Sequence, residues 1–154
     1  MTITMRVEHP PPDNSPLRRF QWTRAAVLWL DEVGPVVRAA LKEAAPVGKG
    51  PRAGRLRDSI RYQRFTQIGT SARGEFTANT PYATYVIKGT RAHRITAKAA
   101  RTLRWESGGQ THFARSVMHP GTKPNHFAEN TMRAQEPYVR QRFAAVMRKE
   151  LGGL

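Results

Sequence analysis

Cysteine is absent from the 154 residues of this sequence. Its absence excludes a disulfide framework, cysteine-ligated zinc, an iron–sulfur cluster and a thiol nucleophile, and it fits a reducing compartment. Acidic residues are also scarce, with 11 Asp and Glu against 26 Lys and Arg. The aspartates Asp13, Asp31 and Asp58 lie far apart, and no two acids have a recognisable metal-ligand spacing. We therefore expect no enzyme activity, no catalytic residue, no cofactor and no bound metal.

Long apolar runs are missing as well. The longest, Ala25 to Leu30, is far shorter than the ~20 residues that span a bilayer, and the N-terminus has no signal-peptide core. The sequence predicts a soluble protein made in the cytoplasm, without a membrane partner. Its 39% hydrophobic residues suffice for the core of one ordinary domain, although the mean hydropathy is −0.59.

Positive charge is what the chain has in excess, with a formal net charge of +15. Such a charge points to polyanions or acidic proteins as partners. The strongest concentration is residues 91–104, a basic segment with no acid and no aromatic residue. Its cations are Arg91, Arg94, Lys98, Arg101 and Arg104. DNA phosphates and an acidic partner protein both fit these cations, and no known nucleic-acid-binding motif is present.

Alternating apolar residues predict strands. Residues 1–7 alternate as in a short strand, either an edge or an arm, and the prolines at 10–12 end it, so we expect an N-terminal arm and connector over residues 1–16. Residues 59–68 and 74–78 predict one antiparallel hairpin. Residues 103–105 and 111–118 predict a second, around the Ser107-Gly108-Gly109 turn. The intervening residues 91–104 are expected to form a long basic loop.

Three- and four-residue spacings predict helices. Apolar residues over 17–45 form one stripe, which Gly34-Pro35 should kink, and another buried face runs from Phe127 to Leu151, which Pro137 should divide into two helices. We therefore expect an α+β fold in a single domain over residues 17–154. An antiparallel sheet of about four strands would be packed by a long N-terminal helix and by C-terminal helices.

Two further patterns concern phosphate and metal binding. The Gly/Pro-rich residues 47–54 resemble a phosphate-binding loop, but no Ser or Thr stands where a Walker A motif requires it. The histidines His112, His119 and His126 are spaced by seven, but Pro120 and Pro124 prevent one continuous helix from presenting them together. Neither pattern indicates a phosphate or metal site.

Three motifs in order resemble the neck or tail-completion proteins of long-tailed bacteriophages, over roughly residues 17–150. They are Ala45-Pro46-Val47 leading to a Gly-Arg-Leu-x-x-Ser-Ile strand at 54–60, Tyr-Ala-x-Tyr-Val-x-x-Gly-Thr at 82–90, and His-Pro-Gly-Thr followed by Phe at 119–127. Two features depart from the family pattern. Ile87-Lys88 stands where an acid is common, and residues 49–52 are extra.

The resemblance implies a structural virion protein that forms a ring, expected to be a hexamer, at the head–tail junction. As a neck or tail-terminator ring it would join the head connector or stopper protein to the tail tube and leave a channel for genomic DNA. It would be found in the virion, and in the host cytoplasm before assembly. The expected subunit and partner interface comprises Tyr82, Tyr85, Gly89, Thr90, His119, Pro120, Gly121 and Phe127, and the basic segment would face acidic partners or DNA. The alternative is a basic nucleic-acid-binding protein acting through residues 91–104.

Overall fold

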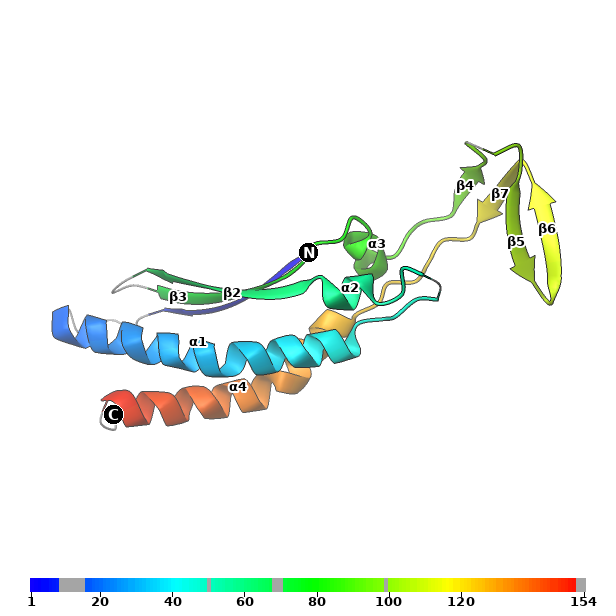
Figure 1. The fold of residues 1–154 in the computed structure, drawn as a ribbon. Helices are drawn as coiled ribbons and strands as arrows, with labels where there is room; N and C mark the ends of the chain where they lie inside the picture. The colour runs from blue at the N-terminus through cyan, green and yellow to red at the C-terminus, as the bar shows by residue number, and fades with distance from the viewer. Residues whose placement is uncertain (9–15, 50, 68–70, 99, 152–154) are drawn as a thin grey trace. The chain divides into compact units, whose positions relative to one another are not determined.

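The computed structural model describes residues 1–8, 16–49, 51–67, 71–98 and 100–151, and it confirms the expected α+β class (Figure 1). The contacts divide the chain into two compact units. The core unit comprises Met1–Ala83 and His126–Leu154, and the ribbon unit comprises Thr84–Asn125. The boundaries between the two units lie inside residues 17–154, which were expected to form one domain.

The core unit consists of a three-stranded sheet and two long helices. The antiparallel sheet has the order β1-β3-β2, formed by β1 (Thr2–Glu8), β2 (Ile60–Gln67) and β3 (Ser71–Ala78). Helix α1 (Pro16–Ala44) packs on β2 and β3, and helix α4 (Phe127–Leu151) packs on α1, so that α1 is the middle layer (Figure 1). The expected hairpin of residues 59–68 and 74–78 is confirmed as β2 and β3, with Ile60 opposite Ala78.

The first strand is part of this sheet along its whole length. Thr2–Glu8 pairs with β3 as an edge strand, and alternate residues supply the packed side, where Met5 is buried. Of the two expected alternatives, an edge strand or an arm, the edge strand is confirmed, because pairing with β3 satisfies the strand's backbone groups and buries an apolar side chain. The connector at residues 9–15 lies outside the described residues.

Helix α1 buries its apolar stripe against both neighbouring layers. The expected periodicity is confirmed, but Phe20 and Leu28, which we placed on the stripe, are exposed. The buried members are Trp22, Ala25, Ala26, Trp29, Leu30, Val33, Val37 and Leu41. The buried face of the helix therefore includes Trp22 and Trp29, while Phe20 and Leu28 lie off it.

Helix α1 runs unbroken through Gly34 and Pro35. The absence of a side chain at Gly34 makes room for the ring of Tyr62 in β2, whose hydroxyl donates a 2.8 Å hydrogen bond to the Leu30 carbonyl. On the sheet side, a Cβ at Gly74 would lie 2.9 Å from the same ring. Burial raises the pKa of Tyr62 to about 12, and the Asp31 carboxylate adds to this rise while Arg64 opposes it.

Helix α4 is also continuous, so the predicted division at Pro137 is wrong. Contacts with α1 hold α4 on the C-terminal side of the proline. The Trp29 indole N–H donates a 3.1 Å hydrogen bond to the Val139 carbonyl, and its ring meets Phe143 edge to face at 5.1 Å. These contacts offset the backbone hydrogen bond that a proline removes from a helix.

One local correction concerns the Gly-Arg-Leu-x-x-Ser-Ile motif. Its first part is a helical turn, α2 (Arg55–Asp58), and the strand begins only at Ile60. Gly54 enters the turn with φ 80°, a conformation that favours glycine, and Leu56 is buried. The motif therefore directs the chain from the loop after α1 into the sheet.

Candidate functional site: a basic beta ribbon without a core

The ribbon unit begins at Thr84, within the helical turn α3 (Ala83–Lys88), and continues as two successive pairs of strands. Strand β4 (His93–Thr96) pairs with β7 (Ser116–His119), and β5 (Leu103–Ser107) pairs with β6 (Gln110–Ala114). The expected second hairpin is confirmed as β5 and β6, although residues 111–118 form two strands separated at Arg115.

The expected basic loop of residues 91–104 is therefore wrong in part. Its central residues 93–96 form β4, and its last residues begin β5. The loop prediction failed because β4 has no hairpin partner nearby in the sequence. It pairs with β7, and the paired residues lie 20 to 26 positions apart in the sequence.

Two consecutive glycines shape the tip of the ribbon. Gly108 and Gly109 have φ of 59° and 77°, and they connect β5 to β6 as a two-residue hairpin loop. Positive φ at both central residues is the signature of a type I′ turn, whose twist matches that of paired strands. The predicted Ser107-Gly108-Gly109 turn is thus confirmed.

A clasp at the base of the ribbon joins Thr90 to Thr122. The two residues exchange backbone hydrogen bonds of 3.0 and 3.1 Å, and their hydroxyl oxygens lie 3.0 Å apart. Gly89 and Gly121 flank the clasp with φ of 70° and 90°. A Cβ on either glycine would overlap the backbone of the opposite chain segment, so the close approach depends on both glycines.

The ribbon has no apolar core among its described residues. None of these side chains is buried, and several large apolar side chains are exposed: Tyr85, Ile95, Trp105, Phe113 and Met118. Phe113 is 64% exposed and Met118 60%. Because isolated two-stranded ribbons are only marginally stable in water, this unit is suited to being covered by a partner.

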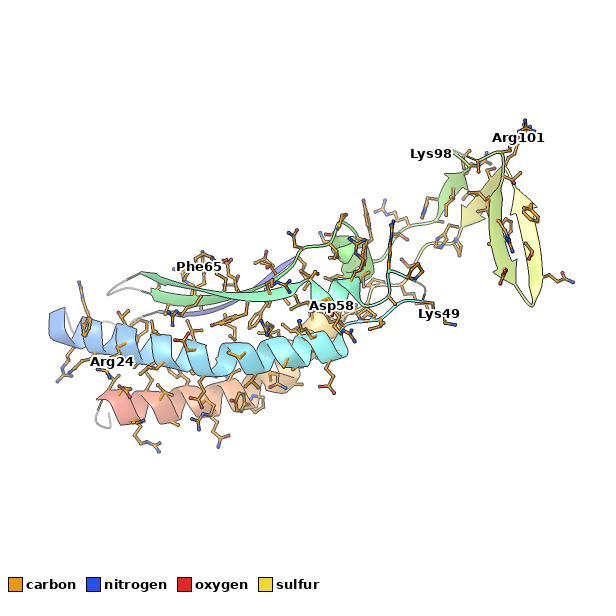
Figure 2. All side chains as sticks on the ribbon, in the orientation of Figure 1. Arg24, Lys49, Asp58, Phe65, Lys98 and Arg101 are labelled. Atoms are coloured by element: carbon orange, nitrogen blue, oxygen red, sulfur yellow. The ribbon has the colours of Figure 1, made fainter. Side chains whose placement is uncertain are left out.

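Positive charge dominates the same unit. Residues 84–125 contain eight Lys and Arg but a single acid, Glu106, which lies 3.5 Å from Arg104. Figure 2 shows Lys98 and Arg101 on the connection between β4 and β5, away from the paired strands. The described side chains of the ribbon therefore combine exposed cations with exposed apolar groups.

Cross-strand histidines add a feature that the sequence reasoning missed. His93 faces His119 across β4 and β7 with ring centres 5.1 Å apart, and Trp105 stacks on His112 at 5.4 Å. The His119 Nδ1 accepts a 3.0 Å hydrogen bond from the Gly121 N–H, which fixes the turn after β7. The first contact was missed because β4 was not predicted, and the second because the β5–β6 hairpin was predicted without its register.

The predicted interface residues are distributed over both units. A shallow open depression of about 640 Å³ in the ribbon unit brings together Tyr85, Gly89, Thr90 and Arg91. His119, Pro120 and Gly121 form the turn that leads into the Thr90–Thr122 clasp. Tyr82, which is 38% exposed, and Phe127, which is buried, belong to the core unit. Their role in an interface stays a prediction.

In the part of the chain that the structure describes, no group of three or more His, Asp or Glu side chains could hold a metal ion. The three histidines at spacing seven lie in β6, at the end of β7 and just before α4. No described helix is long and apolar enough to cross a membrane.

Residues 17–89 match the model of the HK97-gp10-like family, which is described as "Bacteriophage HK97-gp10, putative tail-component". The match confirms the resemblance to a phage tail component in this part of the chain. It covers α1, α2, β2, β3 and α3, and ends where the ribbon begins to pair. No curated protein and no solved structure matches the chain.

Proposed function

We propose that this chain, whose residues 17–89 match a family of phage tail components, is a non-catalytic subunit of a ring at the head–tail junction. The ring joins the head connector to the tail tube, as a neck or tail-terminator layer, and leaves a channel for the genome. The family match is the observation that carries this proposal. The proposed copy number is six, and assembly into the virion takes place in the host cytoplasm.

The architecture of the core unit supports a ring. A closed ring needs two different contact faces on each subunit, because the contacts are heterologous. In the part of the chain that the structure describes, β1 and β2 are the two outer strands of the sheet β1-β3-β2, so each subunit offers two unlike strand edges. The exposed side chains Phe20, Leu28 and Val36 on α1 add apolar contact area.

The ribbon unit supports attachment to a further protein. Its backbone is held by the Thr90–Thr122 clasp and the type I′ turn, while its side chains remain exposed. An element with a defined backbone and no core gains stability when another surface covers it. In the proposed ring, the ribbon is the part of the subunit that reaches a neighbouring layer.

The mass of the purified chain, measured alone and with tail tubes or head connectors, tests this proposal. We expect rings in negative stain, alone or on mixing, and added density at one end only of each tube. A chain that remains monomeric and leaves both tube ends unchanged and the connectors uncovered would contradict the proposal. Density along the whole tube wall would contradict it as well, because a junction protein binds an end.

A further inference from the structure

We propose that the ribbon unit, residues 84–125, docks on an acidic surface of a different virion protein, neither on nucleic acid nor on a second copy of this chain. The inference rests on the proposed function, because it names the partner class of the ribbon. Three observations carry it: the charge of the ribbon, its exposed apolar side chains, and the pairing of the acids in the core unit.

The charge of the ribbon selects an acidic partner. Seven of its eight cations form no ion pair with an acid of the ribbon, because Glu106 is the only acid there and lies next to Arg104. Arg94 and Arg101 lie on and beyond β4 and are exposed. An acidic surface would complement these cations. Such complementarity disfavours binding to other proteins and speeds the encounter between the two partners.

A second copy offers little such surface. Most described carboxylates of the core unit already contact a cationic side chain of the same unit. These pairs are Asp31–Arg64, Glu32–Arg142, Asp58–Arg57, Glu75–Arg73, Glu129–His126, Glu136–Arg140 and Glu150–Arg24. The core unit is itself basic, since residues outside the ribbon carry most of the chain's 26 Lys and Arg. Docking a basic ribbon on a basic copy would bring like charges together.

The apolar side chains favour a protein over DNA. Phosphate contacts would use the arginines and leave Phe113 and Met118 uncovered. One face of Trp105 is already stacked on His112, which makes the ring a poor platform for an unpaired base. Arginine, aromatic residues and methionine together are the composition of a protein interface core.

Both faces of the hairpin take part in the proposed contact. Trp105 and His112 pair on one face of β5 and β6, whereas Arg104 and Phe113 pair on the other. Either face thus combines an aromatic side chain with a polar or cationic neighbour. A groove or cleft in the partner would cover both faces, while a flat surface would cover one.

Binding measurements with three variants test the inference. The charge variant is Arg94→Gln with Arg101→Gln, and the apolar variant is Trp105→Ser with Phe113→Ser. The control variant, Lys49→Gln with Arg52→Gln, removes the same charge from the core unit. The probes are purified head connectors, purified tail tubes and a short random-sequence DNA duplex. Circular dichroism verifies that each variant keeps its fold.

We expect the charge and apolar variants each to bind connectors or tubes about ten- to a hundredfold more weakly, and the control variant to bind like the wild type. Full-strength binding by the apolar variant would overturn the inference. Binding of the duplex as tight as binding of the particles would also overturn it, in favour of DNA. If the charge and apolar variants lost only self-association and still bound connectors and tubes like the wild type, the inference would be overturned in favour of docking on a second copy of the chain.

The location of the bound protein separates this inference from the proposed function. If both ribbon variants still form rings at one tube end with full affinity, the docking inference fails while the ring function stands. If the wild type binds acidic sites along the tube wall through the ribbon, the docking inference stands and the ring function fails. If the wild type binds neither particle, both fail.

Discussion

At the scale of single residues, the fit of Tyr62 between α1 and the sheet depends on two glycines. The absence of side chains at Gly34 and Gly74 leaves room for the ring, and Phe76 packs on it with ring centres 5.0 Å apart. Because the hydroxyl is also bonded to the Leu30 carbonyl, the ring cannot move aside without losing a hydrogen bond. This arrangement explains why a helix interior tolerates glycine here.

We predict that Gly34→Ala destabilises the chain by about 1–2 kcal/mol, because the overlap with Tyr62 outweighs the higher helix propensity of alanine. In a Tyr62→Ala background the same change should stabilise by about 0.5–1 kcal/mol, since only the propensity remains. Urea unfolding of the four proteins measures the cycle. Gly48→Ala, where a Cβ meets nothing within 4 Å, is the control. An equal effect of Gly34→Ala in both backgrounds would contradict the overlap.

The raised pKa of Tyr62 makes a second prediction. The ordinary tyrosine value is 10.0 and the folded value is about 12, so the unfolded chain loses this proton first as the pH rises. The stabilising contribution is complete below pH 10 and is lost between pH 10 and pH 12. Tyr62→Phe should flatten the fall in stability over this interval, whereas Tyr85→Phe, at an exposed site, should not. Unfolding free energies measured every half pH step check this, and identical slopes in the three proteins would refute it.

At the scale of elements, replacing a tryptophan with alanine should lower stability strongly where α1 packs on α4 and hardly at all in the ribbon. Trp29 is 5% exposed and bonded to Val139, whereas Trp105 is 37% exposed on β5. We predict that Trp29→Ala lowers the free energy of unfolding by about 3–5 kcal/mol, as removal of a buried aromatic side chain does. Trp105→Ala should change stability by no more than about 0.5 kcal/mol. Thermal unfolding followed by circular dichroism distinguishes them, and comparable losses would show that the ribbon has a core after all.

The clasp at the base of the ribbon gives a fourth prediction. Gly121→Ala should speed hydrogen exchange at the Thr90 and Thr122 amides, because the new Cβ would overlap the Thr90 carbonyl. Gly108→Ala at the hairpin tip also places a side chain at positive φ, here 59°, but its Cβ meets nothing within 4 Å. It should leave exchange at the clasp unchanged. Equal exchange in the two variants would mean that strain, and not the close approach of the two segments, sets the stability of the clasp.

How far the sequence predicts these elements depends on how local their causes are. The helix over α1, the hairpin β2–β3 and the Gly108-Gly109 turn follow from periodicity and turn chemistry within a few residues. Strand β4 and the helical course of α4 through Pro137 do not, because contacts with β7 and with Trp29 decide them. The basic residues of the candidate site were predicted, while its exposed Phe113 and Met118 required the strand register.

At the scale of the whole molecule, the two units differ in what each would supply to the proposed junction ring. The core unit carries nearly all of the residues that match phage tail components, and it alone contains a buried apolar core among the described residues. The ribbon unit supplies exposed cations and apolar side chains. In our account the first unit builds the ring and the second contacts the neighbouring layer.

Electron microscopy of lysates is the most direct test of this account. A phage that encodes the chain would be grown with the gene interrupted, with and without the wild-type chain supplied in trans. We predict heads and tails that are each complete but remain separate, and joined virions when the wild-type chain is supplied. Joined, infectious virions in the absence of the chain would contradict the claim that it joins heads to tails.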